Sequence, residues 1–169
     1  MFYPSLVLTL AAAAAAIDIR MRPDFQGCAW SGGGWVGCGN LNPNVCCRPP
    51  AGMQTLWIAA IPNGWNIQAQ AWFDSGCSNR SPVLQGGWKV GPDLCEHTGG
   101  NDMRGSSYAF QGRKRGADAS SGCQDVDTFV LADGTTQYNV TGLLPAAIFE
   151  LVSRVLQSEL MLERFTNTL

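Results

Sequence analysis

The sequence predicts a mostly β fold, namely a disulfide-stabilised Greek-key β-sandwich or small barrel followed by a C-terminal α-helix. Three observations lead to this fold class. Seven cysteines provide cross-links, twenty glycines and nine prolines provide many turns, and apolar and polar residues alternate in short segments. Counting these segments gives six or seven short strands at roughly regular spacing, a pattern typical of a sandwich or barrel.

The N-terminus indicates export from the cell. Residues 6–16 form an apolar run that is shorter than the roughly 20 residues needed to span a bilayer and suits the apolar core of a secretory signal. Ala14 and Ala16 are small residues two positions apart, so we expect 1–16 to be a signal peptide and the secreted chain to begin at Ile17. A buried alanine-rich helix is the alternative, but the run has no polar face to make it amphipathic.

The cysteines agree with an extracellular, disulfide-bonded protein. A reducing cytosol would keep them as thiols without evident use, and zinc is not expected because no C-x-x-C pair exists and His97 is the only histidine. Seven is odd, so three bridges would leave one thiol free or paired to another chain. Adjacent Cys46 and Cys47 are expected to reach two different partners. The disulfide candidates are Cys28, Cys38, Cys46, Cys47, Cys77, Cys95 and Cys123.

Composition narrows the function classes. Charged residues make up 14% of the chain and the net charge is −2, which argues against nucleic-acid binding because such proteins carry a basic excess. An apolar content of 46% with six tryptophans can build a core, which argues against disorder. Sequons at Asn79 and Asn139 predict N-glycosylation of an exported chain. We expect a monomer without a transmembrane span, metal or cofactor.

Strands are expected in the middle of the chain. Residues 21–53 are turn-rich and contain four cysteines, so bridges should define them. Apolar and polar residues alternate most clearly in 65–73, where Trp65, Ile67, Ala69, Ala71 and Phe73 fall on one face. The predicted strands are 54–61 and 65–73 around the turn Pro62-Asn63-Gly64, then 83–90, 106–111, and 127–132 with 135–140 as a hairpin over Asp133-Gly134.

The last segment has a helical pattern. Pro145 suits the start of a helix, and Phe149, Val152, Leu156 and Leu160 follow at spacings of three or four. We therefore expect a helix over 145–164 and divide the chain after the signal into a cysteine-rich β-domain, 17–142, and a helical extension, 143–169. The helix is expected to pack on the β-domain or extend from it; contact with a partner or membrane is the alternative.

Short motifs resemble two families. Asp24-Phe25-Gln26-Gly27, Gly64-Trp65 and the stretch 71–76 resemble a βγ-crystallin Greek-key unit, which has an aromatic-x-Gly corner after its first strand, and Phe110-Gln111-Gly112 repeats the Phe-Gln-Gly piece. The full corner motif fails, and the calcium motif of that family is only approached at 101–106, where Gly105 replaces Ser or Thr. The stretch 42–47 is similar to fungal small secreted cysteine-rich proteins.

No catalytic set is evident. Any Ser-His-Asp or Cys-His machinery must use His97, whose neighbours predict a solvated loop. A glycosidase would need two carboxylates, and no spacing singles out a pair. The carboxylates considered are Asp74, Asp93, Glu96, Asp102, Asp125 and Asp127. We therefore do not expect an enzyme.

The tryptophans suggest a ligand instead. Indole rings stack on the apolar faces of sugars, and Trp30, Trp35 and Trp88 lie in glycine-rich stretches that favour exposure, although packing over disulfides is the alternative. Trp57, Trp65 and Trp72 lie in predicted strands and are expected in the core. Lys114 and Arg115 belong to a basic run between glycines, which is either a solvated loop or a dibasic processing site.

These features lead to three functional hypotheses. The first is a secreted, non-enzymatic effector or antimicrobial toxin-like protein that acts on a host or microbial surface target. The second is a cell-wall glycan-binding module, and the third is a small extracellular hydrolase.

Overall fold

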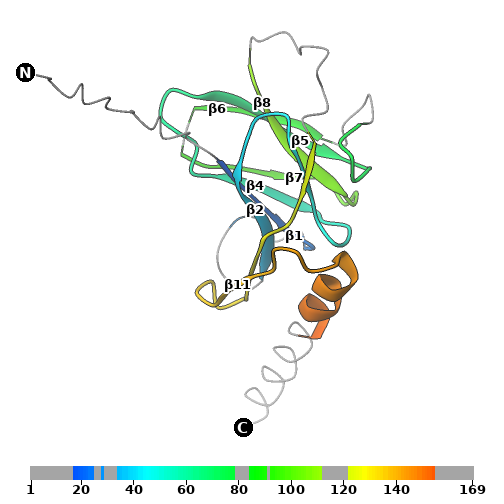
Figure 1. Cartoon of the computed structure of the whole chain (residues 1–169). Coiled ribbons are helices and arrows are strands. Elements are labelled where there is room, and N and C mark those ends of the chain that lie inside the picture. Colours follow the sequence, from blue (N-terminus) through cyan, green and yellow to red (C-terminus); the bar gives the residue numbers. More distant parts are fainter. Residues whose placement is uncertain are drawn as a thin grey trace, which may run out of the picture.

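The fold is a sandwich of two β-sheets with one helix at its C-terminal end (Figure 1). The computed structural model describes residues 17–24, 28, 34–78, 92–111 and 122–154, and the backbone of 84–90. Sheet A has six strands in the order β11-β10-β2-β1-β4-β7, and sheet B has five in the order β6-β5-β8-β3-β9. The strands are β1 (Ile17–Arg22), β2 (Trp35–Leu41), β3 (Cys46–Arg48), β4 (Thr55–Ala59), β5 (Asn66–Trp72), β6 (Leu84–Val90), β7 (Leu94–His97), β8 (Gly105–Phe110), β9 (Cys123–Asp125), β10 (Thr128–Val130) and β11 (Gln137–Asn139). The described strands do not close into a barrel, so the sandwich is the correct alternative.

The core lies between the two sheets because alternate residues of each strand point inward. Ile67, Ala69 and Ala71 of β5 are fully buried, as the alternation predicts. Phe73 follows the end of that strand and is 52% exposed, so its predicted place on the inner face is wrong. The inner residues of β1 are Ile17, Ile19 and Met21.

The strand order reveals two equivalent units, β1–β4 and β5–β8. In each unit the second, first and fourth strands are neighbours in one sheet, and the third strand lies in the other sheet. Each unit is therefore a Greek key whose third strand lies in the sheet of the other unit. Met53 and Met103 lie two residues before the fourth strands, and their backbones exchange N–H···O bonds of 2.9 and 2.8 Å. This reciprocal bridge joins the two units at equivalent positions.

The turn at Pro62-Asn63-Gly64 joins the units instead of closing a hairpin. Gly64 has a φ of +84°, which glycine adopts without steric cost, and Trp65 N–H donates to Pro62 O at 3.1 Å. The strand before this turn, β4, belongs to sheet A, and the strand after it, β5, belongs to sheet B.

The turn-rich segment 21–53 contains two strands that its glycines obscured, β2 and β3. They are joined by a tight turn in which Asn44 has a φ of 65°, and Asn40 near the end of β2 has a φ of 53°; asparagine tolerates this left-handed conformation. Bridges do hold this segment, as expected, but its strands were not predicted. The prediction that His97 lies in a loop is also wrong, because His97 is the last residue of strand β7.

The C-terminal part of the described chain adds a hairpin and a helix. β10 and β11 pair antiparallel, as Asp133-Gly134 predicts, and β10 extends sheet A beside β2. Hydrogen bonds from Thr136 and Thr135 lower the pKa of Asp133 to about 2. The helix covers 145–154 and is anchored by Ile148, which is 1% exposed; the rest of the predicted helix lies outside the described residues.

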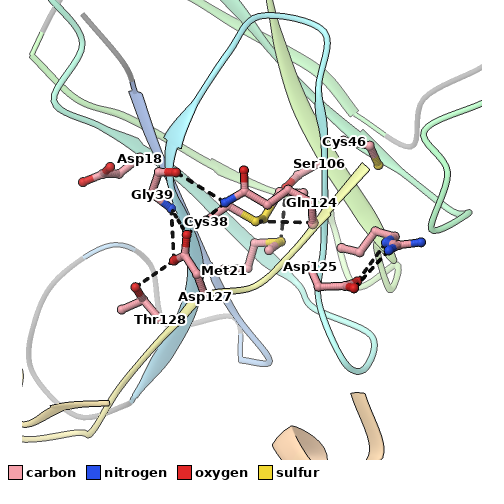
Figure 2. The surroundings of a disulfide bond; sticks show 12 residues. Asp18, Met21, Cys38, Gly39, Cys46, Ser106, Gln124, Asp125, Asp127 and Thr128 are labelled. Carbon is pink, nitrogen blue, oxygen red and sulfur yellow. Dashed lines mark hydrogen bonds and ion pairs between the residues drawn. A yellow bond between two sulfur atoms is a disulfide. The ribbon is translucent and has the colours of Figure 1, made fainter. Parts of the chain in front are cut away.

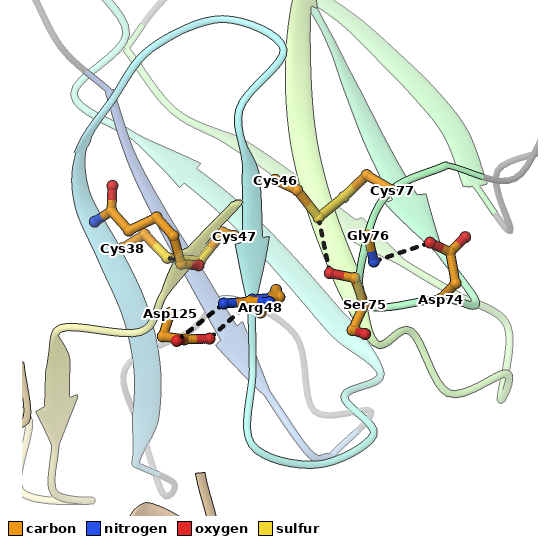
Figure 3. Close-up of polar contacts among 10 residues, drawn as sticks. Cys38, Cys46, Cys47, Arg48, Asp74, Ser75, Gly76, Cys77 and Asp125 are labelled. Atoms are coloured by element: carbon orange, nitrogen blue, oxygen red, sulfur yellow. Dashed lines mark hydrogen bonds and ion pairs between the residues drawn. A yellow bond between two sulfur atoms is a disulfide. The ribbon is translucent and has the colours of Figure 1, made fainter. Parts of the chain in front are cut away.

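Three disulfides connect the sheets and loops. Cys28 bonds to Cys95, Cys38 to Cys47, and Cys46 to Cys77. The adjacent pair Cys46-Cys47 thus reaches two partners, and Figure 3 shows the two bridges leaving β3 in different directions. Cys123 of β9 is exposed and is the free cysteine of the described chain. No helix in the described ranges is long and apolar enough to cross a membrane.

Candidate functional site

An aromatic and charged surface covers the outer face of sheet A. Arg20 of β1 alternates with the inner residues Ile19 and Met21, so its side chain points away from the core. The Arg20 guanidinium carbon lies 4.7 Å from the ring centroid of Trp35 and 4.7 Å from that of Trp57. At this distance a cation attracts the face of an aromatic ring, so one arginine holds two indole rings from β2 and β4.

Gly37 makes this arrangement sterically feasible. A Cβ atom on Gly37 would stand 3.0 Å from Cζ3 of Trp35 and 2.5 Å from the backbone oxygen of Ile19. The Trp35 ring therefore lies across Gly37, in the space that any other side chain would fill. Gly37, inside β2, thus has a structural use: it leaves room for the Trp35 ring to lie along its own strand.

Asp127 fixes the wall of the site beside this ring. Its carboxylate accepts hydrogen bonds from Gly39 N at 3.1 and 3.2 Å, from Gln124 Nε2 at 2.9 Å and from Thr128 Oγ1 at 2.8 Å. Figure 2 shows these bonds converging on Asp127 from β2, β9 and β10. Asp127 therefore fastens the C-terminal hairpin to β2.

Asp18 faces Asp127 across Gly39. A Cβ on Gly39 would lie 3.7 Å from a carboxylate oxygen of Asp18 and 3.7 Å from one of Asp127. The two carboxylates therefore lie close together, on either side of Gly39. Asp18 accepts from Asn40 N at 3.3 Å and lies 3.6 Å from Arg20 Nη2. Both carboxylates are thus engaged with the protein itself.

These residues line a groove of about 410 Å³, a volume in the range of small-ligand sites. Its surface combines one half-buried indole with hydroxyl, amide and carboxylate groups from four strands and their connections. We call this feature the sheet A groove; it is lined by Asp18, Ile19, Arg20, Trp35, Gly37, Cys38, Gly39, Asn40, Asp127, Thr128, Gln137, Asn139 and Thr141.

Comparison with known proteins places the chain in a family. Residues 18–127, more than half of the chain, match the family ARB_05566_N, described as an N-terminal domain. The chain belongs to this family. No curated protein and no solved structure matches the chain significantly.

The sheet A groove lies partly inside and partly outside the ARB_05566_N match. The match contains β1 to β9 and ends at Asp127. The residues that complete the groove, Thr128, Gln137, Asn139 and Thr141, follow it. The groove of this chain is therefore built jointly by the ARB_05566_N domain and the hairpin that extends sheet A.

The three predicted ligand tryptophans do not gather at one site. Trp35 lines the groove, whereas Trp88 lies on β6 of sheet B, opposite Gln68, and Trp30 lies outside the described residues. Trp57 is 8% exposed, so its predicted burial is confirmed, and its ring contacts Arg20 on the outer face of sheet A. No motif or spacing in the sequence indicates that Arg20 contacts Trp35 and Trp57.

The remaining predicted site residues are scattered. Asn139 is exposed at the groove, while Asn79, Lys114 and Arg115 lie outside the described residues.

Phe110 ends β8, the fourth strand of its unit, whereas Phe25 follows β1, the first strand of the other unit. The two Phe-Gln-Gly pieces are therefore not equivalent, and the corner after β5 is Phe73-Asp74-Ser75-Gly76.

Most of the carboxylates considered for catalysis have structural contacts. Asp74 accepts from Gly76 N and Ser78 N at 2.9 and 3.0 Å, and Asp125 pairs with Arg48 at 2.8 Å (Figure 3). The other contacts are Asp93 with Ala60 N at 3.3 Å, Asp102 with Gln54 Nε2 at 3.2 Å, and His97 Nδ1 with Thr55 Oγ1 at 3.2 Å. Within the described residues no group of three or more His, Cys, Asp or Glu side chains could hold a metal ion.

A second hollow of about 490 Å³ lies elsewhere, around Pro49, Pro50 and Arg104. It contains no aromatic side chain among its lining residues. Its charged pair, Arg48 and Asp125, is already joined by an ion pair. The sheet A groove is therefore the better place to seek a ligand.

Proposed function

We propose that this chain is a secreted, non-enzymatic protein that acts at the surface of another cell, as an effector or antimicrobial toxin-like factor, and that it recognises a glycan there. The observation that carries the proposal is the sheet A groove, where the half-buried Trp35 ring lies among hydroxyl and amide groups. An indole offers an apolar face to a sugar ring, and the polar groups around it offer hydrogen bonds to sugar hydroxyls.

Three features support secretion. Three disulfides are formed, and such bonds persist outside the reducing cytosol. β1 begins at Ile17, the first residue after the predicted cleavage site, and the family match begins at Asp18. The matched domain thus lies entirely after the predicted signal peptide.

The contacts of the two groove carboxylates support binding over catalysis. A glycosidase needs one carboxyl group that donates a proton and one that attacks or activates water. The Asp127 carboxylate accepts hydrogen bonds from three neighbouring residues. The Asp18 carboxylate accepts one from Asn40 N and forms an ion pair with Arg20. These contacts support a role of both carboxylates in shaping the groove.

The two Greek-key units support the resemblance to βγ-crystallins. That resemblance implies paired units of this kind, and β1–β4 and β5–β8 share one connectivity. The calcium motif of that family does not carry over, because Gly105 replaces its hydroxyl residue and Asp102 bonds to Gln54. We therefore propose a crystallin-like scaffold without assigning it a calcium site.

The proposal is tested by pull-down of the purified protein on insoluble chitin and insoluble β-glucan. We expect the wild type to be retained on at least one, and Trp35→Ala to lose about tenfold or more in affinity, since losing the apolar contact of an indole face costs more than about 1 kcal/mol. Trp88→Ala, on sheet B, should bind like the wild type. Equal binding by the wild type and Trp35→Ala would refute the groove as the site.

The same pair of proteins tests the action on cells. Purified wild type and Trp35→Ala are applied to microbial and plant cells, and growth and viability are measured. The proposal expects an effect of the wild type that Trp35→Ala lacks. The absence of any effect on either kind of cell would count against the effector and toxin-like role while leaving glycan binding to the pull-down.

A further inference from the structure

The sequon at Asn139 lies on the rim of the groove proposed to bind glycans. We propose that an N-glycan attached to Asn139 folds back into the sheet A groove and competes there with glycans from outside. The inference rests on the proposed function and deepens it, because the first sugars of an N-glycan are N-acetylglucosamine. The groove would then accept N-acetylglucosamine-type sugars and be partly self-occupied.

Strand register places Asn139 on the same face as the Trp35 ring. Asn139 is the partner of Thr128, and Thr128 is the partner of Gly37, over which the ring of Trp35 lies. Residues directly opposite each other on neighbouring strands point to the same side of a sheet. Neighbouring strands are about 4.8 Å apart, so the Asn139 Cα lies about 10 Å from that of Gly37, a distance that the first sugars of an N-glycan cover.

The folded domain accommodates a glycan already attached to Asn139. Its Oδ1 accepts a hydrogen bond from Thr141 N at 2.9 Å, whereas glycosylation substitutes Nδ2. Asn139 is exposed, while Val140 is 1% exposed and its N–H donates to Asp127 O at 2.8 Å. The attachment point is thus accessible and rigidly held beside the groove.

The covalent step precedes folding and balances simply. An oligosaccharide linked to a lipid diphosphate is the donor; its bond from the anomeric carbon to phosphate breaks as a bond to Asn139 Nδ2 forms. The amide nitrogen loses one proton and the lipid diphosphate leaves. The folded domain then confines the glycan next to Trp35.

Tethering gives the glycan a competitive advantage over free ligands. A short flexible tether produces an effective concentration in the millimolar range. If the tethered sugars occupy the groove with a Kd of about 0.1 mM, any free sugar loses roughly tenfold in apparent affinity. Removing the glycan should restore that affinity without any change to Trp35.

The test titrates secreted full-length protein from a glycosylating host with N,N′-diacetylchitobiose, followed by tryptophan fluorescence, after mass spectrometry of the Asn139 peptide. Asn139→Gln and Thr141→Val both remove the sequon, and Asn79→Gln is the matched control at the other sequon. We expect Asn139 to carry a glycan, and both sequon variants to bind the probe roughly tenfold more tightly than the wild type. Asn79→Gln should equal the wild type.

Each other outcome overturns the inference in an identifiable way. An unmodified Asn139 removes the tethered ligand. Equal affinities of glycosylated wild type and Asn139→Gln would show that the glycan stays outside the groove, while glycan binding itself would stand. No response of any variant to the probe, together with Trp35-dependent retention on β-glucan, would refute the N-acetylglucosamine specificity and leave the proposed function intact. No binding to any polysaccharide would refute both.

Discussion

Replacing Cys28 and Cys95 together by serine is expected to lower the free energy of unfolding by about 4 kcal/mol. This bridge spans 67 residues, the longest separation of the three, and a cross-link restricts the unfolded chain more as its loop lengthens. Cys95 is exposed and Cys28 is half-buried, so serine adds little cost in the folded state. Urea unfolding of the purified double variant measures the change.

The same variant should also weaken the groove. Cys95 lies opposite Trp57 in the pairing of β4 with β7, and Trp57 holds one side of Arg20. Cys123→Ser is the matched control, since this exposed thiol is in no bridge, and its stability should stay within about 0.5 kcal/mol of the wild type. A loss below about 1 kcal/mol in the double variant would show that the bridge does not stabilise the fold as described.

Asp127→Ala is expected to cost about 3 kcal/mol. The substitution leaves the donors of Gly39, Gln124 and Thr128 without their shared acceptor; hydrogen bonds to a charged group contribute about 1.5–3 kcal/mol each, and partial exposure of Asp127 lets water replace some of them. Because Asp127 ties the hairpin to β2, glycan binding should fall as well. Urea unfolding and the chitin or glucan pull-down measure the two effects.

Asp127→Asn removes the negative charge of the side chain while keeping its size and shape. The amide retains one acceptor oxygen, so we expect a loss of about 1 kcal/mol, intermediate between wild type and Asp127→Ala. If Asp127→Ala were as stable as the wild type, Asp127 would not anchor the hairpin, and the groove wall would have to be explained by other contacts.

The fold class could be predicted from sequence because its signals are local. Alternation in β5 and the Asp133-Gly134 turn each specify a strand or a hairpin within a few residues. The strands β2 and β3 could not be found in this way, since glycines and cysteines carry no alternation of their own. Their formation depends on pairing with β1 and β8, which is not a local property.

The repeated unit left a weak trace in the sequence. Gly-Gly-Trp occurs at 33–35 and again at 86–88, each time at the second strand of a unit, and Gly-Cys occurs at 27–28 and 76–77 after the first strand. Trp35 opens β2 whereas Trp88 is the fifth residue of β6, so these pieces mark equivalent strands without aligning their residues.

The groove was only partly predictable. Flanking glycines favour exposure of Trp35, which makes it a candidate ligand residue from sequence. Arg20 and Trp57 come near Trp35 only through the register of β1 with its neighbouring strands. Asp18 and Asp127 are 109 positions apart in the sequence and come together at Gly39 only because β2 passes between them. Contacts of this kind depend on topology, which no short motif encodes.

The central claim, that the sheet A groove binds glycans, is tested most directly by nuclear magnetic resonance of labelled, glycan-free Asn139→Gln protein. Chitohexaose and laminarihexaose are titrated separately to millimolar concentration, and backbone amide and indole N–H shifts are followed. The account predicts saturable changes at the Trp35 indole and at the amides of Gly39, Asn40 and Thr128, which surround the groove. Changes confined to sheet B, or no change with either sugar, would contradict it.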